Sequence, residues 1–538
     1  MWSKVIKFLL TLLLFVMIWS KISNTFDGDL GWHLRFGKEA LSSNFQYKDS
    51  YTYPYFGQEW TNHEWGGDVF FWWIYSHLGY YFLVMLVTTA LFASFFLATK
   101  MVDGKTTIPG LVAAIFFAHA STHIFVMRLA MFTPLFFILC WYSLRKIPTA
   151  TAGPRLGGGG GKNYYWFWPL LFWLWAALHG SWVLGFIVIN IYVVGNLGQI
   201  ILHCLRPEFL NSSWRRVDFL KVIVAEILSL IAIVLNPYGF KILFEVGSYF
   251  SQAYFKSHIT EWLPSYTFPV FWASLAWSTV VLFLAILLVS RKKINLPELL
   301  LIGALFISGF EYKRNVIFIL LVGIPLIAGV ADYVMAELGK NNSISKSLEQ
   351  KAPKVVALVC GLAAIISLLI FFGMKINIYD DIWTQRGILW SNIMPYDATE
   401  FLKRRIGDRP ERIFNEFNWG GYLNWKLPKA FVYLDGRGTA TWINPKDPKE
   451  TMLETYMKLR YDPDGLRMIE NENARYIILR NSVVPVFARP DWVNRFIFGE
   501  ELKPLFETVV TELDKNLNNN SNWRLIYNDR IANIWEKK

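Results

Sequence analysis

The chain is poor in cysteine, and the few cysteines that it has do not form a recognisable site. Its 538 residues include only three, namely Cys140, Cys204 and Cys360, and each lies inside or at the end of an apolar stretch. Thiols placed in this way support neither a disulfide framework nor a cysteine metal site. The cellular compartment must therefore be inferred from topology.

Charge is scarce as well. Charged residues make up 17% of the chain, against 54% hydrophobic and 17% aromatic residues, and the apolar residues form long blocks. A chain of this length and apolarity is typical of a polytopic membrane protein and not of a soluble domain. The net charge of +12 comes from short clusters between the apolar blocks. These clusters indicate membrane topology and argue against a nucleic-acid partner.

The N-terminus lacks a signal-peptide cleavage site. Lys4 and Lys7 precede an apolar run from Phe8 to Trp19, as they would in a signal peptide, but Lys21 and Ile22 stand where small residues would be needed. The pattern predicts a retained first membrane helix.

Eleven apolar segments predict an α-helical polytopic membrane protein with about 11 transmembrane helices. The first five cover about 8–19, 80–99, 108–126, 131–144 and 166–178. The sixth and seventh end at about 201 and 235, and the eighth and ninth cover about 269–289 and 296–310. The tenth ends at about 335, and the eleventh covers about 355–372. Lys and Arg cluster in every second connection, and the positive-inside rule assigns those connections and the N-terminus to the cytoplasm. The C-terminus is then extracytoplasmic. Losing the short fourth or fifth segment would reverse everything downstream.

The expected domains are a transmembrane domain over 1–376 and a soluble extracytoplasmic α/β domain over 377–538. Large outer loops are expected at about 23–79 and 236–268 of the first domain. In the second, helical periodicity appears at 398–405 and 450–459, buried strands are expected at 430–434 and 475–479, and a hairpin at 523–535.

The first outer loop begins with two acids, Asp27 and Asp29. Carboxylates at this spacing can share one cation or bind one hydroxyl, and a partly dry interface raises a carboxyl pKa toward the range of a base. The alternative is that they cap a helix over Leu30–Leu41. His33 follows Asp29 at helical spacing and shares its face of that helix.

A second polar cluster, His63, Glu64 and Asp68, closes the same loop. Together with the aspartates it offers metal ligands, although His63-Glu64 lacks the second histidine of a metalloprotease pattern. A metal site formed by Asp27, Asp29 and His63 is one hypothesis. The alternative is an interfacial loop with aromatic anchors.

Three cations, Arg128, Lys313 and Arg314, stand at span ends predicted to be extracytoplasmic, where the positive-inside rule gives no reason for them. Arginine binds phosphate oxygens through a bidentate fork, so these residues are candidates for a lipid phosphate or pyrophosphate. Snorkelling to headgroups is the alternative. His179, in a helix break, either lines the same cavity or is a hydrogen-bonded residue at the membrane edge.

Glycines flank polar residues at the ends of expected strands in the C-terminal domain. The segments are Asn415–Asn418, Trp419–Tyr422 and Leu434–Arg437. Such positions suit a rim that faces substrate, whereas tight turns alone would also explain the glycines.

Taken together, these motifs resemble the GT-C class of membrane glycosyltransferases. The Asp-x-Asp run Asp27-Gly28-Asp29 follows the first span, many spans come next, and an α/β domain ends the chain. A closer resemblance is to an uncharacterised bacterial multi-spanning family. It rests on the Asp-Leu-x-Trp-His-Leu-Arg-x-Gly run at 29–37, and on 63–65, 178–180, 236–239, 261–262, 419–422 and 435–437.

The GT-C resemblance implies a sugar carried on a polyprenyl phosphate and a first-loop acid that acts as base or coordinates a divalent metal, Mg or Mn. Asp29 is the first choice for the acid that activates the acceptor, with Asp27, His63 and Glu64 beside it as catalytic candidates. The substrate-binding candidates are His33, Arg35, Asp68, Arg128, His179, Tyr238, Glu261, Lys313, Arg314, Asp435 and Arg437.

The expected function is that of a glycosyltransferase in a bacterial-type plasma (inner) membrane. It would move a sugar from a polyprenyl-phosphate-linked donor to an extracytoplasmic glycan, lipid or protein acceptor. A transporter or flippase of lipid-linked glycans is an alternative, and it would predict ionisable residues at mid-membrane depth and two matched halves. The sequence shows few buried charges, with Glu226 the main exception, and no evident duplication, which argues against this alternative. A non-enzymatic envelope-assembly protein is another.

Overall fold

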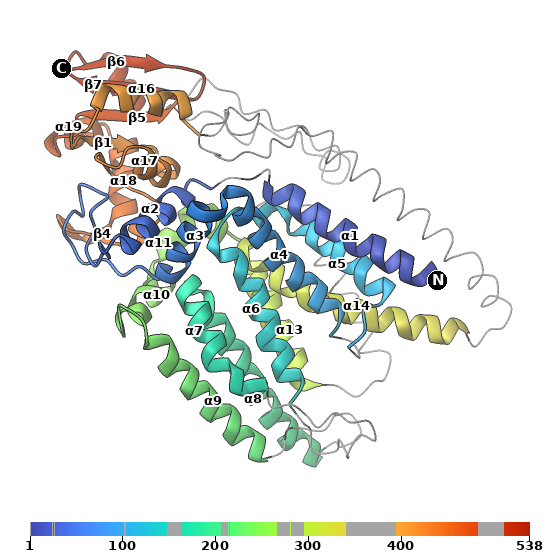
Figure 1. Ribbon diagram of the computed structural model, residues 1–538. Coiled ribbons are helices and arrows are strands. Elements are labelled where there is room, and N and C mark those ends of the chain that lie inside the picture. The colour runs from blue at the N-terminus through green and yellow to red at the C-terminus, as the bar shows by residue number, and fades with distance from the viewer. Residues whose placement is uncertain are drawn as a thin grey trace. The chain divides into compact units, whose positions relative to one another are not determined.

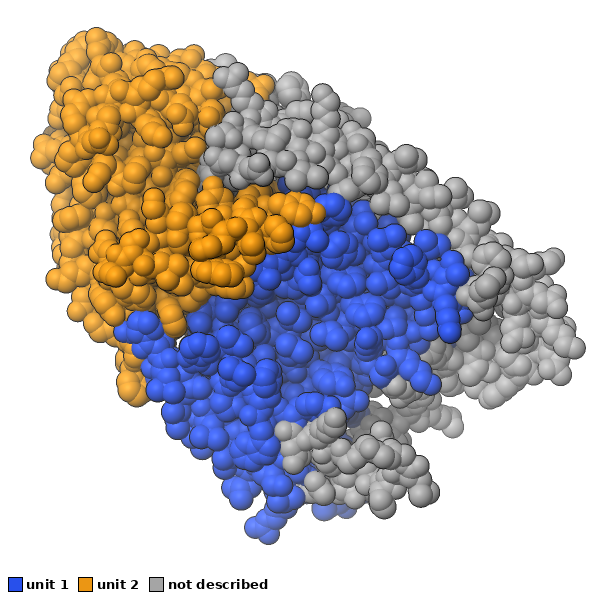
Figure 2. Space-filling view, viewed as in Figure 1, with its two compact units in different colours: residues 1–23, 84–237, 260–376 blue, residues 24–83, 238–259, 377–538 orange. Residues whose placement is uncertain are grey.

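The structure is a computed structural model. It describes residues 2–23, 25, 27–101, 104–147, 164–205, 214, 216–265, 280, 284, 295–339, 394–481 and 510–538. The spans expected at 269–289 and 355–372 therefore lie almost wholly outside the described residues. The chain divides into two compact units (Figure 2). Unit 1 comprises 1–23, 84–237 and 260–376, and unit 2 comprises 24–83, 238–259 and 377–538.

Every other expected span coincides with a helix. These are α1 (Trp2–Ser23), α4 (Tyr80–Thr99), α5 (Ile108–Ala120), α6 (Thr133–Arg145), α7 (Trp168–Leu178), α8 (Val183–Leu205), α9 (Arg216–Val234), α13 (Leu296–Glu311) and α14 (Val316–Gly339). Among the described residues, four helical segments are long and apolar enough to cross a membrane: Ser3–Ser23, Tyr80–Thr99, Gly180–Cys204 and Lys313–Ala331. The membrane class is confirmed, while the number of about 11 helices is not.

The helices of unit 1 pack closely where glycine removes a side chain. α8 packs against α6 and α13, α7 against α9, and α14 against α5 and α13 (Figure 1). A Cβ on Gly195 of α8 would lie 2.6 Å from Cα of Pro297 in α13, so only glycine permits this approach. By contrast, α9 exposes a row of aliphatic side chains, including Leu220 (65%) and Ile227 (54%). Such a row is typical of a surface that lipid covers.

The C-terminal part of unit 2 contains an α/β fold, as expected from its sequence. Its five-stranded sheet has the order β2-β1-β5-β7-β6, in which β1 pairs in parallel with β2 and β5, and β7 pairs antiparallel with β5 and β6. The strands are β1 (Arg412–Asn415), β2 (Phe431–Val432), β5 (Tyr476–Arg480), β6 (Trp523–Asn528) and β7 (Ala532–Lys537). β6 and β7 form the expected hairpin.

Helices complete this part of unit 2. They are α16 (Tyr396–Ile406), α17 (Gly420–Lys426), α18 (Met452–Tyr461), α19 (Gly465–Asn471) and α21 (Glu512–Asn519), beside a short ribbon of β3 (Ile443–Asn444) and β4 (Asp447–Thr451). A capping box between Thr451 and Glu454 fixes the start of α18, and a second between Thr511 and Asp514 fixes the start of α21.

The outer loops contribute the rest of unit 2. The first loop supplies α2 (Leu30–Leu41) and α3 (Trp65–Leu78), and the segment after residue 237 supplies α10 (Lys241–Ser251) and α11 (Ala253–His258). α2 packs against α3 and against α17 of the C-terminal part. The acids and histidines of the first loop therefore belong to the same compact unit as the C-terminal motifs.

Candidate functional site

Helix α2 approaches the C-terminal motif Trp419–Tyr422 backbone to backbone. A Cβ on Gly31 would lie 2.2 Å from the carbonyl oxygen of Gly421, and one on Gly421 would lie 2.6 Å from the carbonyl oxygen of Gly28. Both distances are far below normal contact, so the glycines of the two motifs are explained by this packing. We call the contact the glycine seam; it brings two motifs that are distant in sequence into one structure.

Asp29 and Asp27 do different things at the start of α2. Asp29 occupies the N-cap position, but its side chain accepts no capping hydrogen bond. Its partly exposed carboxylate instead lies against Gly436, where an added Cβ would be 1.8 Å from Oδ1 of Asp29. Asp27 is 9% exposed, and its Oδ1 accepts a hydrogen bond from the Asp29 amide at 3.0 Å. The main chain is therefore held by Asp27, whereas the Asp29 carboxylate lies against Gly436.

His33 joins the two polar clusters of the first loop. Its Nδ1 lies 2.5 Å from Oδ1 of Asp68, and its Nε2 lies 3.8 Å from Oε2 of Glu64. The Asn62 amide donates to the other Asp68 oxygen at 2.6 Å, and all four side chains are buried. Burial raises the pKa of the Asp68 carboxyl well above its usual range, although Asn62 and the charge of Arg437 lower it.

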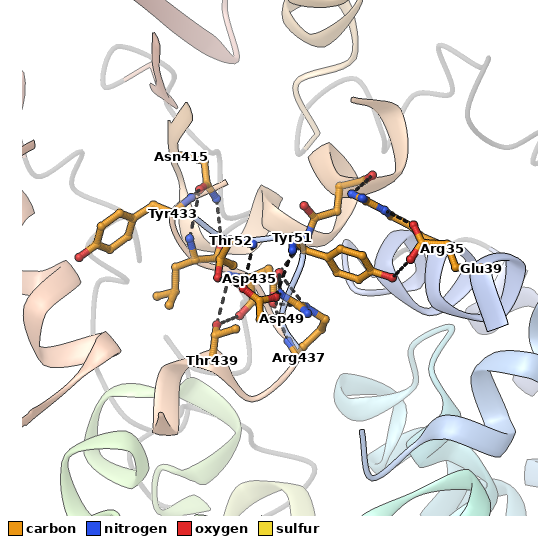
Figure 3. A network of polar contacts seen from close by, with 12 residues as sticks. Arg35, Glu39, Asp49, Tyr51, Thr52, Asn415, Tyr433, Asp435, Arg437 and Thr439 are labelled. Carbon is orange, nitrogen blue, oxygen red and sulfur yellow. Dashed lines mark hydrogen bonds and ion pairs between the residues drawn. The ribbon is translucent and has the colours of Figure 1, made fainter. Parts of the chain in front are cut away.

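Arg437 lies at the centre of a buried ion-pair network (Figure 3). Its Nη2 is 2.7 Å from Oδ1 of Asp49 and 2.9 Å from Oδ2 of Asp435, and all three side chains have no exposed surface. Burial raises the pKa of Asp435, and the two aspartates raise that of Arg437 although burial opposes this. Neither Asp435 nor Arg437, both substrate-binding candidates, reaches the surface; they hold the first loop to the C-terminal part.

Arg35 belongs to the same network (Figure 3). The ring of Tyr51 lies between two guanidinium groups, with Cζ of Arg35 at 4.0 Å and that of Arg437 at 4.3 Å from the ring centroid. Arg35 also donates to Glu39 Oε1 at 2.9 Å and to the carbonyl oxygen of Asn424 at 3.1 Å. Cation–π contacts and charge-assisted hydrogen bonds therefore occupy this candidate.

His63 and Tyr238 lie in the part of unit 2 that includes α10. The His63 ring is 5.4 Å from the ring of Tyr249. Tyr238 is 7% exposed, and its hydroxyl donates to the carbonyl oxygen of Gln46 at 2.8 Å. Nearby on α10, burial raises the pKa of Glu245 to about 7, although a hydrogen bond from Trp442 lowers it.

The basic candidates converge in unit 1. Nη1 of Arg128 lies 2.8 Å from Glu261 Oε1, and Nη1 of Arg314 lies 3.8 Å from Oε2 of the same residue. Burial alone would raise the pKa of Glu261, but Arg128, Arg314 and Lys313 outweigh it and lower the pKa. Three cations around one carboxylate leave an excess of positive charge in a partly buried position, which suits an anion with two negative charges.

His179 is held by local contacts. Its Nδ1 lies 2.8 Å from the Ser181 hydroxyl and accepts the Ser181 amide at 3.1 Å, so it caps a short turn of helix over Gly180–Trp182. The Trp175 indole donates to the same hydroxyl at 3.0 Å. This geometry is that of the hydrogen-bonded alternative considered for His179.

The proposed metal ligands do not form a ligand set in the described structure. Across the residues that the structure describes, no three His, Cys, Asp or Glu side chains gather in a way that could hold a metal ion. In particular, Asp27 binds the Asp29 amide, and the His63 ring packs against Tyr249. A divalent metal held by Asp27, Asp29 and His63 therefore stays a prediction from the sequence.

Sequence reasoning missed Asp49, Asn62 and Glu245. Asp49 begins a tight turn in which its carboxylate accepts the amides of Tyr51 and Thr52; this pattern is visible in sequence but common in loops. Asn62 directly precedes the His63-Glu64 pair and could have been included with it. Glu245 had no signal, because a single glutamate in an amphipathic helix is ordinary.

Comparison with solved structures finds this fold in the Archaeoglobus fulgidus oligosaccharyltransferase. The structure tethered with an acceptor peptide containing the NVT sequon has a TM-score of 0.54 and 12% identity, over 87% of this chain and 68% of that one. The apo form has a TM-score of 0.53 and 11% identity, over 87% and 69%. The complex with Zn and sulfate has a TM-score of 0.52 and 11% identity, over 96% and 78%.

Sequence comparison adds nothing to this likeness. No protein-family model matches the chain, and no curated protein matches it in sequence. At such low identity the likeness concerns the fold, and it agrees with the GT-C class expected from the arrangement of motifs. The chain thus has a GT-C fold, and its activity has to be argued from its own residues.

Proposed function

We propose that the protein is a membrane glycosyltransferase. It would transfer a sugar from a polyprenyl-phosphate carrier to an acceptor on the extracytoplasmic side of a bacterial-type inner membrane. The observation that carries the proposal is the convergence of Arg128, Lys313 and Arg314 on the single carboxylate of Glu261. The GT-C fold, shared with an oligosaccharyltransferase, supports it.

In the proposed reaction, an acceptor hydroxyl oxygen attacks the anomeric carbon of the lipid-linked sugar. The new bond forms between these two atoms, the bond from the anomeric carbon to the phosphate oxygen breaks, and Asp29 takes the hydroxyl proton. The leaving phosphate carries away the electron pair of the broken bond as negative charge. Base catalysis and stabilisation of the leaving group are the two tasks that this transfer requires.

Asp29 is the best candidate for the base among the first-loop acids. Asp27 is committed to the main chain, and Glu64 and Asp68 are buried beside His33. Asp29 has a partly exposed side chain and no capping role. His33 and Asp68 then act as positioning residues, because their pairing ties α2 to α3. The proposal assigns no step to a metal.

In this proposal, Arg128, Lys313 and Arg314 stabilise the leaving phosphate. Guanidinium groups bind phosphate oxygens with paired, charge-assisted hydrogen bonds. Glu261 keeps Arg128 and Arg314 close together when no anion is bound, which limits the side-chain entropy lost on binding. Snorkelling alone would not require this shared carboxylate.

The test uses the full chain in lipid nanodiscs with synthetic polyprenyl phosphates that carry one labelled sugar. Release of free polyprenyl phosphate, with the sugar appearing on an acceptor or on water, supports the proposal. Movement of the intact lipid-linked sugar across a proteoliposome membrane without cleavage would contradict it and favour the flippase alternative. The Arg128→Met variant, which cannot bind phosphate oxygens, should lose the release activity.

A further inference from the structure

The contact between Gly436 and Asp29 assigns a role to the C-terminal part of unit 2. An ideal Cβ built on Gly436 would lie 1.8 Å from Oδ1, 2.4 Å from Cγ and 2.6 Å from Oδ2 of Asp29, and these are the three nearest atoms to it. The carboxylate of the first loop therefore occupies the volume that a side chain at residue 436 would need.

The backbone at Gly436 does not by itself demand glycine. Its φ lies outside the left-handed region, unlike that of Gly438, whose φ is +91°. An alanine at 436 would thus be compatible with the local backbone, and the obstacle is the Asp29 carboxylate. Most glycines in tight turns are explained by their own φ, whereas this one is explained by its neighbour.

The turn that carries Gly436 is held rigidly on both sides. Asp435 and Arg437 are fully buried and paired, and Arg437 also binds Asp49 of the first loop. A Cβ on Gly420 would lie 2.7 Å from Cβ of Asp435, so the turn is also packed tightly on the α17 side. The turn cannot easily retreat from an added methyl group, and Asp29 would have to move.

We propose that Gly436 is a positioning residue for Asp29, so that the C-terminal part of unit 2 sets where the first-loop acid lies. This inference rests on the proposed function for its catalytic consequence, but its geometric part stands independently. A displacement of about 1 Å at a reacting group can reduce turnover roughly 100-fold.

The geometric part is tested with the full chain in nanodiscs by a double-mutant cycle on thermal unfolding. Gly436→Ala should lower the unfolding temperature by about 1–3 °C, because the Asp29 side chain must leave its packed position and the cost is spread over a chain of 538 residues. In an Asp29→Ala background, which lacks the three obstructing atoms, Gly436→Ala should cause a much smaller shift. Equal shifts in both backgrounds, or no shift in either, would overturn the inference.

A matched control is Gly247→Ala on α10. A Cβ at this position meets nothing within 4 Å, and the backbone there has no positive φ. The unfolding temperature of the Gly247→Ala variant should therefore not fall. This control separates a steric effect at Gly436 from a general loss of glycine flexibility.

The catalytic part is tested on donor cleavage in the same nanodiscs, with the labelled polyprenyl-phosphate sugar as substrate. Gly436→Ala should lower kcat at least tenfold while KM for the donor changes little, and it should cause no further loss in an Asp29→Asn background. A raised KM with unchanged kcat would contradict positioning of the base. If the wild type cleaves no donor, the proposed function fails, and the unfolding cycle still decides the geometric part.

Discussion

Asp49 and Arg437 stand 388 positions apart in the chain, yet Oδ1 of one lies 2.7 Å from Nη2 of the other, and both side chains are fully buried. The first outer loop and the C-terminal part of unit 2 are joined by this pair and by the glycine seam. The acids of the loop consequently take their positions from residues near the other end of the chain.

Loss of the buried guanidinium should be costly. Arg437→Met would leave Asp49 and Asp435 buried without their cation, and breaking such a pair costs about 3–5 kcal/mol. Thermal unfolding of the purified wild-type and Arg437→Met proteins measures this loss of stability. The control is Arg467→Met, whose ion pair with Asp464 is 73% and 70% exposed, and which should change stability by less than about 0.5 kcal/mol. Similar shifts for the two variants would argue against a structural role for Arg437.

The glycine seam should not tolerate a methyl group. Gly31→Ala would place a Cβ 2.2 Å from the carbonyl oxygen of Gly421. Because the obstructing atom belongs to the backbone, α2 would have to move. We expect a loss of stability of at least about 1–3 kcal/mol, seen as lower yield and a lower unfolding temperature. Gly247→Ala, at an open helical position, is the control. A Gly31→Ala protein as stable as wild type would show that the seam is looser than described.

The cation cluster should govern donor affinity. Arg128→Met removes a charge-assisted contact worth about 1.5–3 kcal/mol, which corresponds to roughly 10- to 100-fold in binding. Binding of an unglycosylated polyprenyl phosphate in nanodiscs measures the effect. Lys241→Met removes an exposed cation that pairs with Glu59 and should leave this affinity unchanged. If both variants bind equally well, Arg128 does not contact the phosphate.

Glu245 should make stability fall as pH rises. Its pKa in the folded protein is raised to about 7 from 4.5, so the folded state binds more protons than the unfolded state between these values. Stability is therefore fully present below about pH 4.5, and about 3 kcal/mol of it is lost as pH rises from 4.5 to 7. Unfolding temperatures measured from pH 5 to pH 8 should show this slope in wild type and a flatter one in Glu245→Gln. An unchanged slope in the variant would assign the dependence to another group.

Membrane helices and the closing hairpin were predictable because their signals are local. Apolar blocks and alternating strands can be recognised within a short window of neighbouring residues. The helices at the expected spans follow such patterns, as do the strands β2, β5, β6 and β7. The GT-C arrangement was also predictable, since it rests on the order of such segments along the chain.

The roles of single polar residues were harder to predict. Asp435 and Arg437 follow a strand beside a glycine, which is also the pattern of a substrate-facing rim, and only the distant Asp49 shows that they are buried. The bond of the His33 side chain to Asp68 of α3 was not foreseen. Long-range pairing leaves no local trace in a single sequence, so burial of these groups could not be foreseen.

The central claim is that Asp29 supplies the base for sugar transfer. Asp29→Asn keeps the shape of the side chain and its contact with Gly436 but cannot take a proton, so turnover of the labelled polyprenyl-phosphate sugar should fall by about 100- to 10,000-fold with little change in unfolding temperature. Turnover equal to that of wild type in this correctly folded variant would contradict the account.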